Sequence, residues 1–265
     1  MSRPVTGCIV MYQNDRTKLE AAIGSTLSSD LVEKLYLVDN SPTDALRDLA
    51  NDDRIEYLHN PANPGFGAAH NLAIAAVLGN SRYHIVINPD VYFDAEAITS
   101  LVTFMDEHPE VGHTMPKVLY PNGDLQYLCK TNPTPFDLFA RRFLPGGLQK
   151  LFAKRMAAYE YRDKDRNPAH DYDRTMFDIP YLSGCFMFLR TDTLERVGFF
   201  DERIFMYIED ADLTRRFLQV SRTAYFPGAT IHHHFEKGSH RNRKLMWYSI
   251  QGAFVYFRKW GWFGR

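Results

Sequence analysis

Cysteine is scarce in this chain, and its three cysteines, Cys8, Cys129 and Cys185, form no CxxC pair or similar cluster. An odd number of cysteines without metal-ligand spacing suggests reduced thiols in a cytoplasmic protein. Cys8 and Cys185 lie in apolar runs, so we expect both in the hydrophobic core.

Long apolar runs are missing too. Residues 1–6 lead directly into a short apolar run and lack the apolar region of a signal peptide. No uninterrupted apolar stretch reaches the length needed to span a bilayer. The formal net charge is only −1. No global field therefore directs the protein toward nucleic acid, and we expect no nucleic-acid partner.

The chain has neither an internal repeat nor a low-complexity linker. Its 265 residues are long for one domain and short for two, and 45% of them are apolar, so we expect one large α/β domain. Strand-like apolar runs in the first part occupy 7–11, 34–38, 54–58 and 84–87, and helical patterns occupy 15–28 and the segment that ends at Leu78. Strands separated by helices predict a mostly parallel sheet with helices on both faces.

Two acids follow strands of this predicted sheet. Asp39 comes directly after the 34–38 run, and Asp90 comes shortly after the 84–87 run. In open sheets of this kind, ligands bind outside the carboxyl ends of the strands. Asp39 and Asp90 are therefore predicted to lie at the ligand-binding edge.

A third group of acids lies between Phe205 and Leu213, where Glu209, Asp210 and Asp212 follow apolar and aromatic residues. Carboxylates at such a boundary cost free energy unless they are paired, hydrogen-bonded or bound to cations. The helical spacing that follows predicts that Asp210 and Asp212 lie near a helix N-terminus, where the helix dipole favours negative charge. The alternative is a helix cap with solvated acids. Around this stretch, strands are expected at 180–189 and 223–226, and helical pieces near 137–158.

A series of short motifs, in order, spans nearly the whole chain and resembles the bacterial family 2 glycosyltransferases, which are nucleotide-sugar enzymes of the GT-A fold. The motifs are Val10–Asn14, Val38–Ser41, Asn63–Asn71, Ile87–Asp90, Leu182–Gly184, Tyr207–Arg216, and Ile231-His232 followed by Gly238-Ser239. The tail, 256–263, is most similar to the rhamnosyltransferase-type branch. The resemblance implies an α/β GT-A fold with a mostly parallel central sheet flanked by helices.

The resemblance also implies a divalent cation, Mg²⁺ or Mn²⁺, which neutralises charge on the departing diphosphate. In the family, an Asp of a D-x-D-like motif supports that cation. The matching segment here is Asn88-Pro89-Asp90, so Asp90 is the expected ligand, and Asn88 replaces the first acid and removes one charge. The alternative interpretation of this segment is a strand-ending turn.

Nucleotide contacts are implied for the ends of the first two strands. Asp39 resembles the family acid that contacts the nucleoside, and Tyr12 and Asn14 are expected beside the base. Asn88 and Asn71 complete the expected donor-binding set, although Asn71, like Gly65, is expected mainly to shape its loop. A nucleotidyltransferase is disfavoured because the segment 12–16 is not a glycine-rich phosphate loop.

For catalysis, inversion at the anomeric carbon requires a general base for the acceptor hydroxyl. The family places it in the Glu-Asp pair, so Asp210 is the expected base and Glu209 the competing assignment. Ser183 and Gly184 are implied on the acceptor side. Asp212 and Arg216 are expected to form a structural i,i+4 pair.

A histidine is the other implied ligand. His232 resembles the family histidine near the metal or the diphosphate. In a strand, His232 and His234 would share one face and His233 would lie on the other, which leaves the register open. Alternatively, the three histidines are only a polar strand end. A zinc site is not expected, because no acid or cysteine lies at ligand spacing nearby.

Two segments without acids, 138–159 and 237–265, combine basic and aromatic residues. Such segments favour docking on an anionic membrane surface, which would bring the enzyme to a lipid-linked acceptor. The alternative is that they pack on the core or on another subunit.

These observations predict an inverting glycosyltransferase that moves a sugar from a dTDP- or UDP-sugar, dTDP-rhamnose being the first choice, to a growing bacterial cell-surface polysaccharide. We expect it in the cytoplasm or peripherally on the inner face of the cytoplasmic membrane. The single GT-A domain, 1–265, is divided into a nucleotide-sugar-binding half (1–115), an acceptor-binding and catalytic half (116–240) and a basic aromatic C-terminal helix (241–265). The alternative is a non-catalytic member that binds sugar nucleotides or serves as a scaffold in a polysaccharide assembly complex.

Overall fold

The structure is a computed structural model that describes residues 4–138, 152–235 and 243–262. Its strands are β1 (Val5–Met11), β2 (Val32–Asp39), β3 (Ile55–His59), β4 (Tyr83–Ile87), β5 (Val91–Tyr92), β6 (Val111–Leu119), β7 (Cys129–Lys130), β8 (Met176–Phe177), β9 (Tyr181–Leu182), β10 (Phe186–Arg190) and β11 (Arg222–His233). Its helices are α1 (Arg16–Leu27), the short 3₁₀ helix η1 (Arg47–Leu49), α2 (Phe66–Val77), α3 (Ala95–Glu107), α6 (Ala153–Tyr159), α7 (Thr191–Val197), α8 (Glu209–Phe217) and α9 (Arg243–Trp260).

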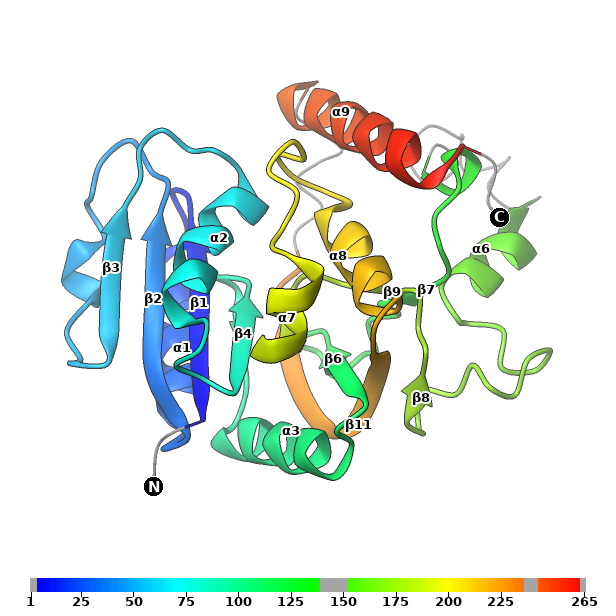
Figure 1. The fold of residues 1–265 in the computed structure, drawn as a ribbon, viewed down its shortest axis with the longest axis horizontal. Coiled ribbons are helices and arrows are strands. Elements are labelled where there is room, and N and C mark those ends of the chain that lie inside the picture. Colours follow the sequence, from blue (N-terminus) through cyan, green and yellow to red (C-terminus); the bar gives the residue numbers. More distant parts are fainter. Residues whose placement is uncertain (1–3, 139–151, 236–242, 263–265) are drawn as a thin grey trace.

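A nine-stranded sheet runs through the described part of the chain, in the order β3-β2-β1-β4-β10-β6-β11-β5 with β8 paired to β11 (Figure 1). Strands β1 to β4 are parallel to one another. Strand β10 is antiparallel to both β4 and β6, so β6 runs in the direction of β4, and β11 is parallel to β6. The sheet is therefore mostly parallel, as the sequence predicts, and β5, β8 and β10 run the other way.

Helices cover both faces of the sheet, and the side-chain alternation of each strand explains why. In β1, Ile9 and Met11 belong to the core formed with α1 and α3, whereas Cys8 and Val10 pack with α2. Further along the sheet, α7 and α8 pack beside Val86 and Met187 on the α2 face. This alternation is the period of two that a strand imposes on its side chains.

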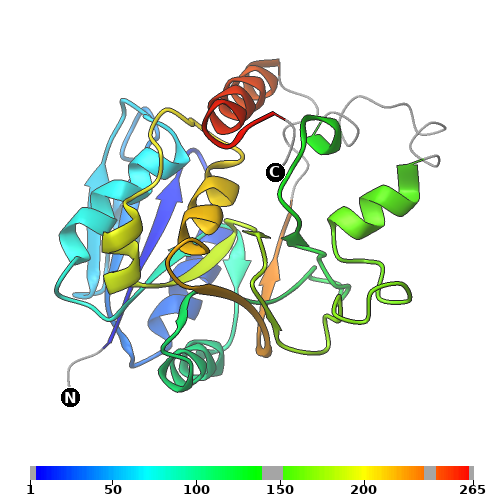
Figure 2. The ribbon, with the colours of Figure 1, turned by 45° about the vertical axis from the view of Figure 1, so that its right-hand side comes forward.

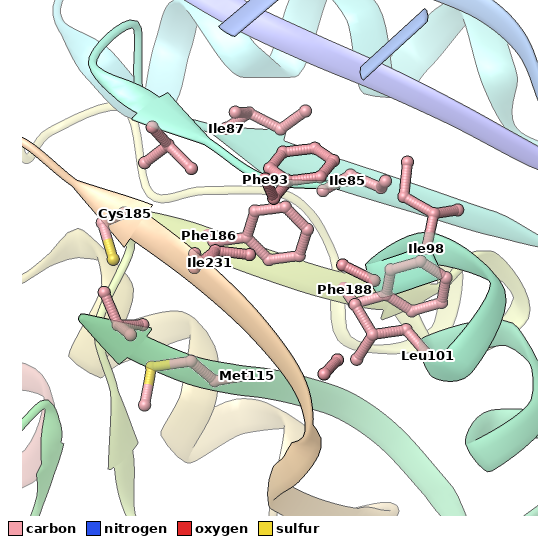
Figure 3. Packing of buried hydrophobic residues seen from close by; sticks show 14 of the residues in the cluster. Ile85, Ile87, Phe93, Ile98, Leu101, Met115, Cys185, Phe186, Phe188 and Ile231 are labelled. Atoms are coloured by element: carbon pink, nitrogen blue, oxygen red, sulfur yellow. The ribbon is translucent and has the colours of Figure 1, made fainter. Parts of the chain in front are cut away.

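The largest core lies beneath β4, β10 and β6 (Figure 3). Phe186 of β10 meets Phe93 edge-to-face, with ring centroids 5.4 Å apart. Ile85 and Ile87 of β4 lie beside this aromatic pair, and Cys185 lies at the end of the same core, so its thiol is buried as predicted. This packing fixes the start of β10 against the end of β4.

Local sequence accounts for the starts of the first helices. The Asp15 carboxylate caps α1 by accepting the backbone N–H of Lys18 at 3.0 Å. Before α2, Gly65 has φ +107°, and a Cβ there would lie 2.3 Å from the carbonyl oxygen of Phe205. Only glycine therefore permits this close approach between the start of α2 and the loop before α8.

Three segments differ from the sequence expectations. No element was predicted between Asp90 and 121, where β5, α3 and β6 lie. The expected strand 180–189 is divided into β9 and β10 by a turn at Ser183-Gly184. Of the helical pieces expected near 137–158, α6 lies in the described chain, and 139–151 lie outside it. Among the described residues, we find no helix with the length and hydropathy required to cross a membrane.

Candidate active site

The carboxyl ends of the parallel strands bring the first two predicted acids to the same edge of the sheet. Met11 of β1 is the register partner of Asp39 in β2, and Ile9 of β1 is the partner of Ile87 in β4. Asp90 follows Ile87 after a short turn. Asp39 ends β2 and Asp90 follows β4, so both lie at the carboxyl ends of the strands that flank β1, as expected for ligand-binding residues.

Asp90 lies beside a histidine of β11. Its Oδ1 is 3.4 Å from Nε2 of His233, and its carbonyl oxygen accepts the backbone N–H of His234. His233 is buried, and its Nδ1 lies 3.0 Å from Oε1 of Gln126. Burial lowers the pKa of His233, but Cys185 and the Asp90 carboxylate raise it by more than burial lowers it. The net pKa of His233 is therefore above its ordinary value.

The histidine beside Asp90 is His233, whereas the sequence interpretation chose His232. The predicted alternation along the strand is correct, because His232 stacks on Tyr92 with centroids 4.9 Å apart and His234 contacts the same ring. The register that the sequence leaves open is therefore the one that brings His233 to the Asp90 side chain, with β11 pairing His232 to Tyr92 and His233 to Val91 of β5. The motif residues Gly238-Ser239 lie outside the described chain.

The turn between β9 and β10 contacts both Asp210 and the segment that contains Asp90. The backbone N–H of Gly184 donates to Oδ2 of Asp210 at 2.8 Å. The carbonyl of the next residue, Cys185, accepts the N–H of Asn88 at 2.9 Å. Asn88 lies two residues before Asp90, so one turn holds the Asp210 carboxylate and the backbone of the Asn88-Pro89-Asp90 segment.

Glu209 and Asp210 form a buried pair at the first turn of α8. Both are less than 10% exposed. Burial raises the pKa of Asp210, and Lys130, two backbone N–H groups and the hydroxyl of Tyr181 oppose that rise. Burial and the charge of Asp210 raise the pKa of Glu209 well above its usual value, and its Oε2 has no hydrogen-bond partner among the described residues. Burial thus disfavours the ionised form of both carboxyls, but only Asp210 has several neighbouring groups that favour its ionised form.

Sequence reasoning missed two residues that surround Asp210. The hydroxyl of Tyr181 donates to Oδ2 of Asp210 at 3.3 Å. The ammonium of Lys130 lies 4.4 Å from the centre of the Tyr181 ring, and its charge favours the ionised form of Asp210. Lys130 lies on β7, which pairs with β9. Neither residue belongs to a motif. Tyr181 lies two positions before the Ser183-Gly184 segment, and this proximity in sequence was the one signal that could have indicated its place in the site.

The expected nucleoside residues lie together at the ends of β1 and β2. The backbone N–H of Tyr12 donates to Oδ1 of Asn14 at 2.6 Å, and the Tyr12 side chain is half exposed. Asp39 is fully buried, its Oδ1 accepts the N–H of Ser41, and its Oδ2 accepts the hydroxyl of Tyr57 at 2.6 Å. A nucleobase can reach Asp39 only if Tyr57 or its neighbours move.

Asn71 is occupied by contacts with the chain itself. Its Nδ2 donates to the carbonyl of Phe200 at 3.0 Å and to Glu202 at 2.9 Å, and its Oδ1 accepts the N–H of Phe200. These bonds tie α2 to the loop that leads to α8. They favour the loop-shaping role that we expected over a direct contact with the donor.

The protein residues near Asp90 can supply only part of the coordination shell of a divalent cation. In the described part of the chain, no group of three or more His, Cys, Asp or Glu side chains is arranged to hold a metal. The Asp90 carboxylate, which is partly exposed, and the neighbouring His233 imidazole supply two donors. Phosphate oxygens and water would complete a six-coordinate shell, which is the usual arrangement for Mg²⁺ or Mn²⁺ at nucleotides.

Comparison with solved structures identifies the class of fold. The structure is similar to GalNAc-T7 with UDP, GalNAc and Mn²⁺ (TM-score 0.67, 11% identity, 97% of this chain and 50% of that chain). It is also similar to the mannosyltransferase PcManGT of Pyrobaculum calidifontis with GDP-Man and Mn²⁺ (TM-score 0.60, 15% identity, 96% and 64%). At this identity the likeness concerns the fold, which is that of GT-A glycosyltransferases. The chain spans half the length of the first of these and less than two thirds of the second.

Sequence comparison gives the family. The family model for Glycosyl transferase family 2 matches residues 8–198, and the chain belongs to this family. It is 27% identical over 221 residues to the N-acetylglucosaminyl-diphospho-decaprenol L-rhamnosyltransferase of Mycobacterium tuberculosis, covering 79% of this chain and 69% of the relative. It is 26% identical over 189 residues to the low-salt glycan biosynthesis hexosyltransferase Agl10 of Haloferax volcanii, covering 70% and 53%. The predicted family and the prediction of a glycosyltransferase are thereby confirmed.

Proposed function

We propose that this glycosyltransferase inverts the anomeric carbon of a nucleotide-diphosphate sugar while transferring the sugar to a lipid-linked saccharide of a bacterial cell-surface polysaccharide. The observation that carries the proposal is that one turn holds both sides of the site: Gly184 donates to Asp210, and Cys185 accepts the N–H of Asn88, two residues before Asp90. A donor diphosphate held near Asp90 would then present its sugar toward Asp210. The first half, 1–115, would hold the donor, and 116–240 would hold the acceptor beside Ser183 and Gly184.

Asp210 is the proposed general base. Burial raises its pKa, which makes the carboxylate a stronger base, and Gly184, Tyr181 and Lys130 favour its ionised form. Glu209 is the weaker candidate, because burial and the charge of Asp210 raise its pKa well above the usual value and its Oε2 has no hydrogen-bond partner among the described residues. The acceptor hydroxyl would transfer its proton to Asp210 as its oxygen attacks the anomeric carbon.

Asp90 and His233 are the proposed protein ligands of Mg²⁺ or Mn²⁺. When bound, the cation neutralises negative charge that develops on the departing diphosphate. The protein residues hold it at the edge of the sheet, and Asn88 keeps the turn in place through its backbone bond to Cys185. The two structural neighbours solved with Mn²⁺ and a nucleotide or nucleotide sugar support this assignment.

Donor and acceptor are proposed from the relatives. A relative that transfers L-rhamnose to a diphospho-decaprenol-linked sugar supports dTDP-rhamnose as the first donor to test and a polyprenol-linked saccharide as the acceptor. UDP-galactose, UDP-glucose and UDP-N-acetylhexosamines are the next donors, because single pocket residues change donor choice. We propose that Asp39, Tyr12 and Asn14 contact the base.

Helix α9 is the proposed membrane contact. Trp247, Ile250 and Phe254 are exposed and follow one another at helical spacing, and Arg258 continues the same face one turn later. Exposed aromatic residues next to cations are typical of helices that lie in the interface of an anionic bilayer. A hollow of about 500 Å³ borders this face and is lined by Arg203, Phe254, Val255, Arg258 and Lys259. Such docking would place the enzyme peripherally on the inner face of the cytoplasmic membrane.

Vesicle pelleting tests the membrane contact. We expect the protein to sediment with phosphatidylglycerol vesicles at low salt, to be released by high salt, and not to bind phosphatidylcholine vesicles. Trp247→Ala and Phe254→Ala should weaken the binding. Absence of binding to anionic vesicles at either salt concentration would reject the membrane contact without affecting the proposed chemistry.

The catalytic proposal is tested by a panel of nucleotides and nucleotide sugars with Mn²⁺, first by thermal shift and then by transfer to a polyprenol-diphosphate saccharide. Binding to the native state raises the melting temperature by mass action, so the panel identifies both base and sugar. We expect one donor to bind and to be consumed, and Asp210→Asn to bind it without turnover. Binding without turnover by the wild-type protein would instead favour the scaffold alternative.

A further inference from the structure

The turn that leads into the catalytic pair is conformationally strained. Tyr207 and Ile208, directly before Glu209, have φ values of +71° and +72°. This left-handed region is disfavoured for residues with a Cβ, and most of all for a β-branched residue such as Ile208. Such a turn persists only when surrounding contacts hold it. The direction in which Glu209 and Asp210 point therefore depends on those contacts.

Helix α9 packs on this turn, and the ribbon views place it alongside α8 (Figure 2). A Cβ at Gly252 would lie 3.0 Å from the carbonyl oxygen of Tyr207 and 3.1 Å from Cγ2 of Ile204. Glycine at this position thus lets the helix backbone reach the turn. One helical turn earlier, the ring of Tyr248 stacks on Phe205 with centroids 3.9 Å apart.

A buried carboxylate anchors the other end of α9. Asp212 is fully buried and lies two residues after Asp210 on α8. Its Oδ1 accepts the indole N–H of Trp260 at 2.8 Å and lies 2.8 Å from the ammonium of Lys259. Arg216 of α8 holds Oδ2 at 2.9 Å, the predicted i,i+4 pair. Removing any one donor from a buried carboxylate costs much free energy, because the charge is then left without a partner.

A second set of contacts connects α9 to Asp210 through Tyr181. Tyr181, Ile208 and Ala211 share one hydrophobic cluster with Tyr256 and Phe257 of α9. The hydroxyl of Tyr181 is bonded to Oδ2 of Asp210. The same helix thus supports the strained turn, the third residue of the acidic motif and the tyrosine that touches the base.

We propose that Gly252 and Trp260 of α9 are positioning residues that hold the Glu209-Asp210 pair in its reactive orientation. The inference rests on the proposed function of Asp210. Neither residue touches the reacting atoms: Gly252 acts through the Tyr207-Ile208 turn, and Trp260 acts through Asp212. In this proposal α9 positions the Glu209-Asp210 pair through Gly252 and Trp260.

Two substitutions in the full chain test this role, Trp260→Phe and Gly252→Ala. The first keeps an aromatic ring and removes the indole N–H, and the second adds one methyl group against the turn. We expect kcat to fall by about tenfold to a hundredfold, as for small displacements of a catalytic group, and the pH profile of kcat to shift. The dissociation constant for the nucleotide with Mn²⁺ should stay within about twofold, since the site near Asp90 is not touched. Gln251→Ala, an exposed position of the same helix, serves as the matched control and should match wild type.

Hydrogen exchange provides a readout that does not require turnover. In Trp260→Phe, amides of residues 207–213 should exchange faster than in wild type, whereas amides of β1 and β2 should not change. The proposal would be overturned if both kcat and hydrogen exchange were unchanged in the variants. It would also be overturned if kcat fell only in proportion to the fraction of protein that is unfolded. If the wild-type protein consumes no donor but the Trp260→Phe variant exchanges faster at 207–213, the proposed function is refuted and the role of α9 is supported. If one variant fails to fold, the other provides the same comparison.

Discussion

The backbone N–H of Gly184 donates to Oδ2 of Asp210 at 2.8 Å. The turn between β9 and β10 thus binds the side chain at the start of α8. That turn is also fixed on its other side, because the carbonyl of Cys185 accepts the N–H of Asn88. Main-chain groups of one turn therefore hold both the Asp210 carboxylate and the backbone of Asn88, two residues before Asp90. Main-chain bonds of this kind hold catalytic groups more rigidly than contacts between mobile side chains.

The first prediction concerns the base. Asp210→Asn keeps the size of the side chain and removes its ability to take a proton. We expect kcat to fall by about 10²–10⁴-fold, the usual contribution of a general base, with donor affinity unchanged by isothermal titration. Glu209→Gln should retain far more activity than Asp210→Asn. The reverse order would assign the base to Glu209.

The second prediction concerns stability and pH. The raised pKa of Glu209 means that the folded protein binds a proton that the unfolded chain releases above pH 4.5. Between pH 4.5 and the raised pKa, the free energy of unfolding therefore falls as pH rises. Glu209→Gln removes this contribution, so urea unfolding should show the variant gaining stability relative to wild type from pH 5 to pH 8. The exposed Glu195→Gln is the control, and a flat difference between Glu209→Gln and wild type would contradict the assignment.

The third prediction concerns Gly184. A Cβ at this position would lie 3.0 Å from Cβ of Asp210, so Gly184→Ala should displace the base and lower kcat. Gly24 of α1 has no atom within 4 Å of the added Cβ. Gly24→Ala should thus be neutral or stabilising by about 1 kcal/mol. Equal effects of the two substitutions on kcat would argue that Gly184 has no special relation to Asp210.

The fourth prediction concerns buried histidine. His113 is fully buried, neither ring nitrogen has a partner in the described chain, and burial lowers its pKa to about 3. Between that value and 6.5, the unfolded chain binds a proton that the folded protein excludes, so stability falls as pH decreases. At pH 5 the loss is about 2 kcal/mol. His113→Leu should reduce this acid sensitivity in urea unfolding, whereas His108→Leu, at a half-exposed position, should not.

The fifth prediction concerns the metal. Chelation by EDTA should abolish sugar transfer, and Mn²⁺ or Mg²⁺ should restore it, because the proposed role of Asp90 and His233 is to hold a cation that neutralises the diphosphate. The Asp90→Ala variant should show as little sugar transfer as the EDTA-treated enzyme, even when Mn²⁺ is added. His232→Ala should leave the metal requirement unchanged, since His232 stacks on Tyr92. Full activity in EDTA would show that Asp90 acts without a cation.

The sequence predicts the first parallel strands well, because the apolar runs of β1, β2 and β4 are largely buried on both faces. The helix α3 was missed although Ala97, Ile98, Leu101, Phe104 and Met105 are its buried stripe. That spacing was available as a helical pattern. The division of 180–189 was not, because its cause is the distant contact between Gly184 and Asp210.

Within the site, residues of short motifs were predictable, and residues that reach it from elsewhere were not. Asp90 and Asp210 are marked by their neighbours in sequence. Lys130 and Tyr181 reach Asp210 only through the pairing of β7 with β9. The choice between His232 and His233 depended on where β11 ends, and strand ends are set by pairing with β5 rather than by composition.

The most direct test of the account is a crystal structure of the Asp210→Asn variant with its donor and Mn²⁺, with the metal located by anomalous scattering. The account predicts the Mn²⁺ peak between Asp90, His233 and the diphosphate, with the anomeric carbon facing the amide at position 210. A metal or donor bound on another face, with its sugar remote from residue 210, would contradict it.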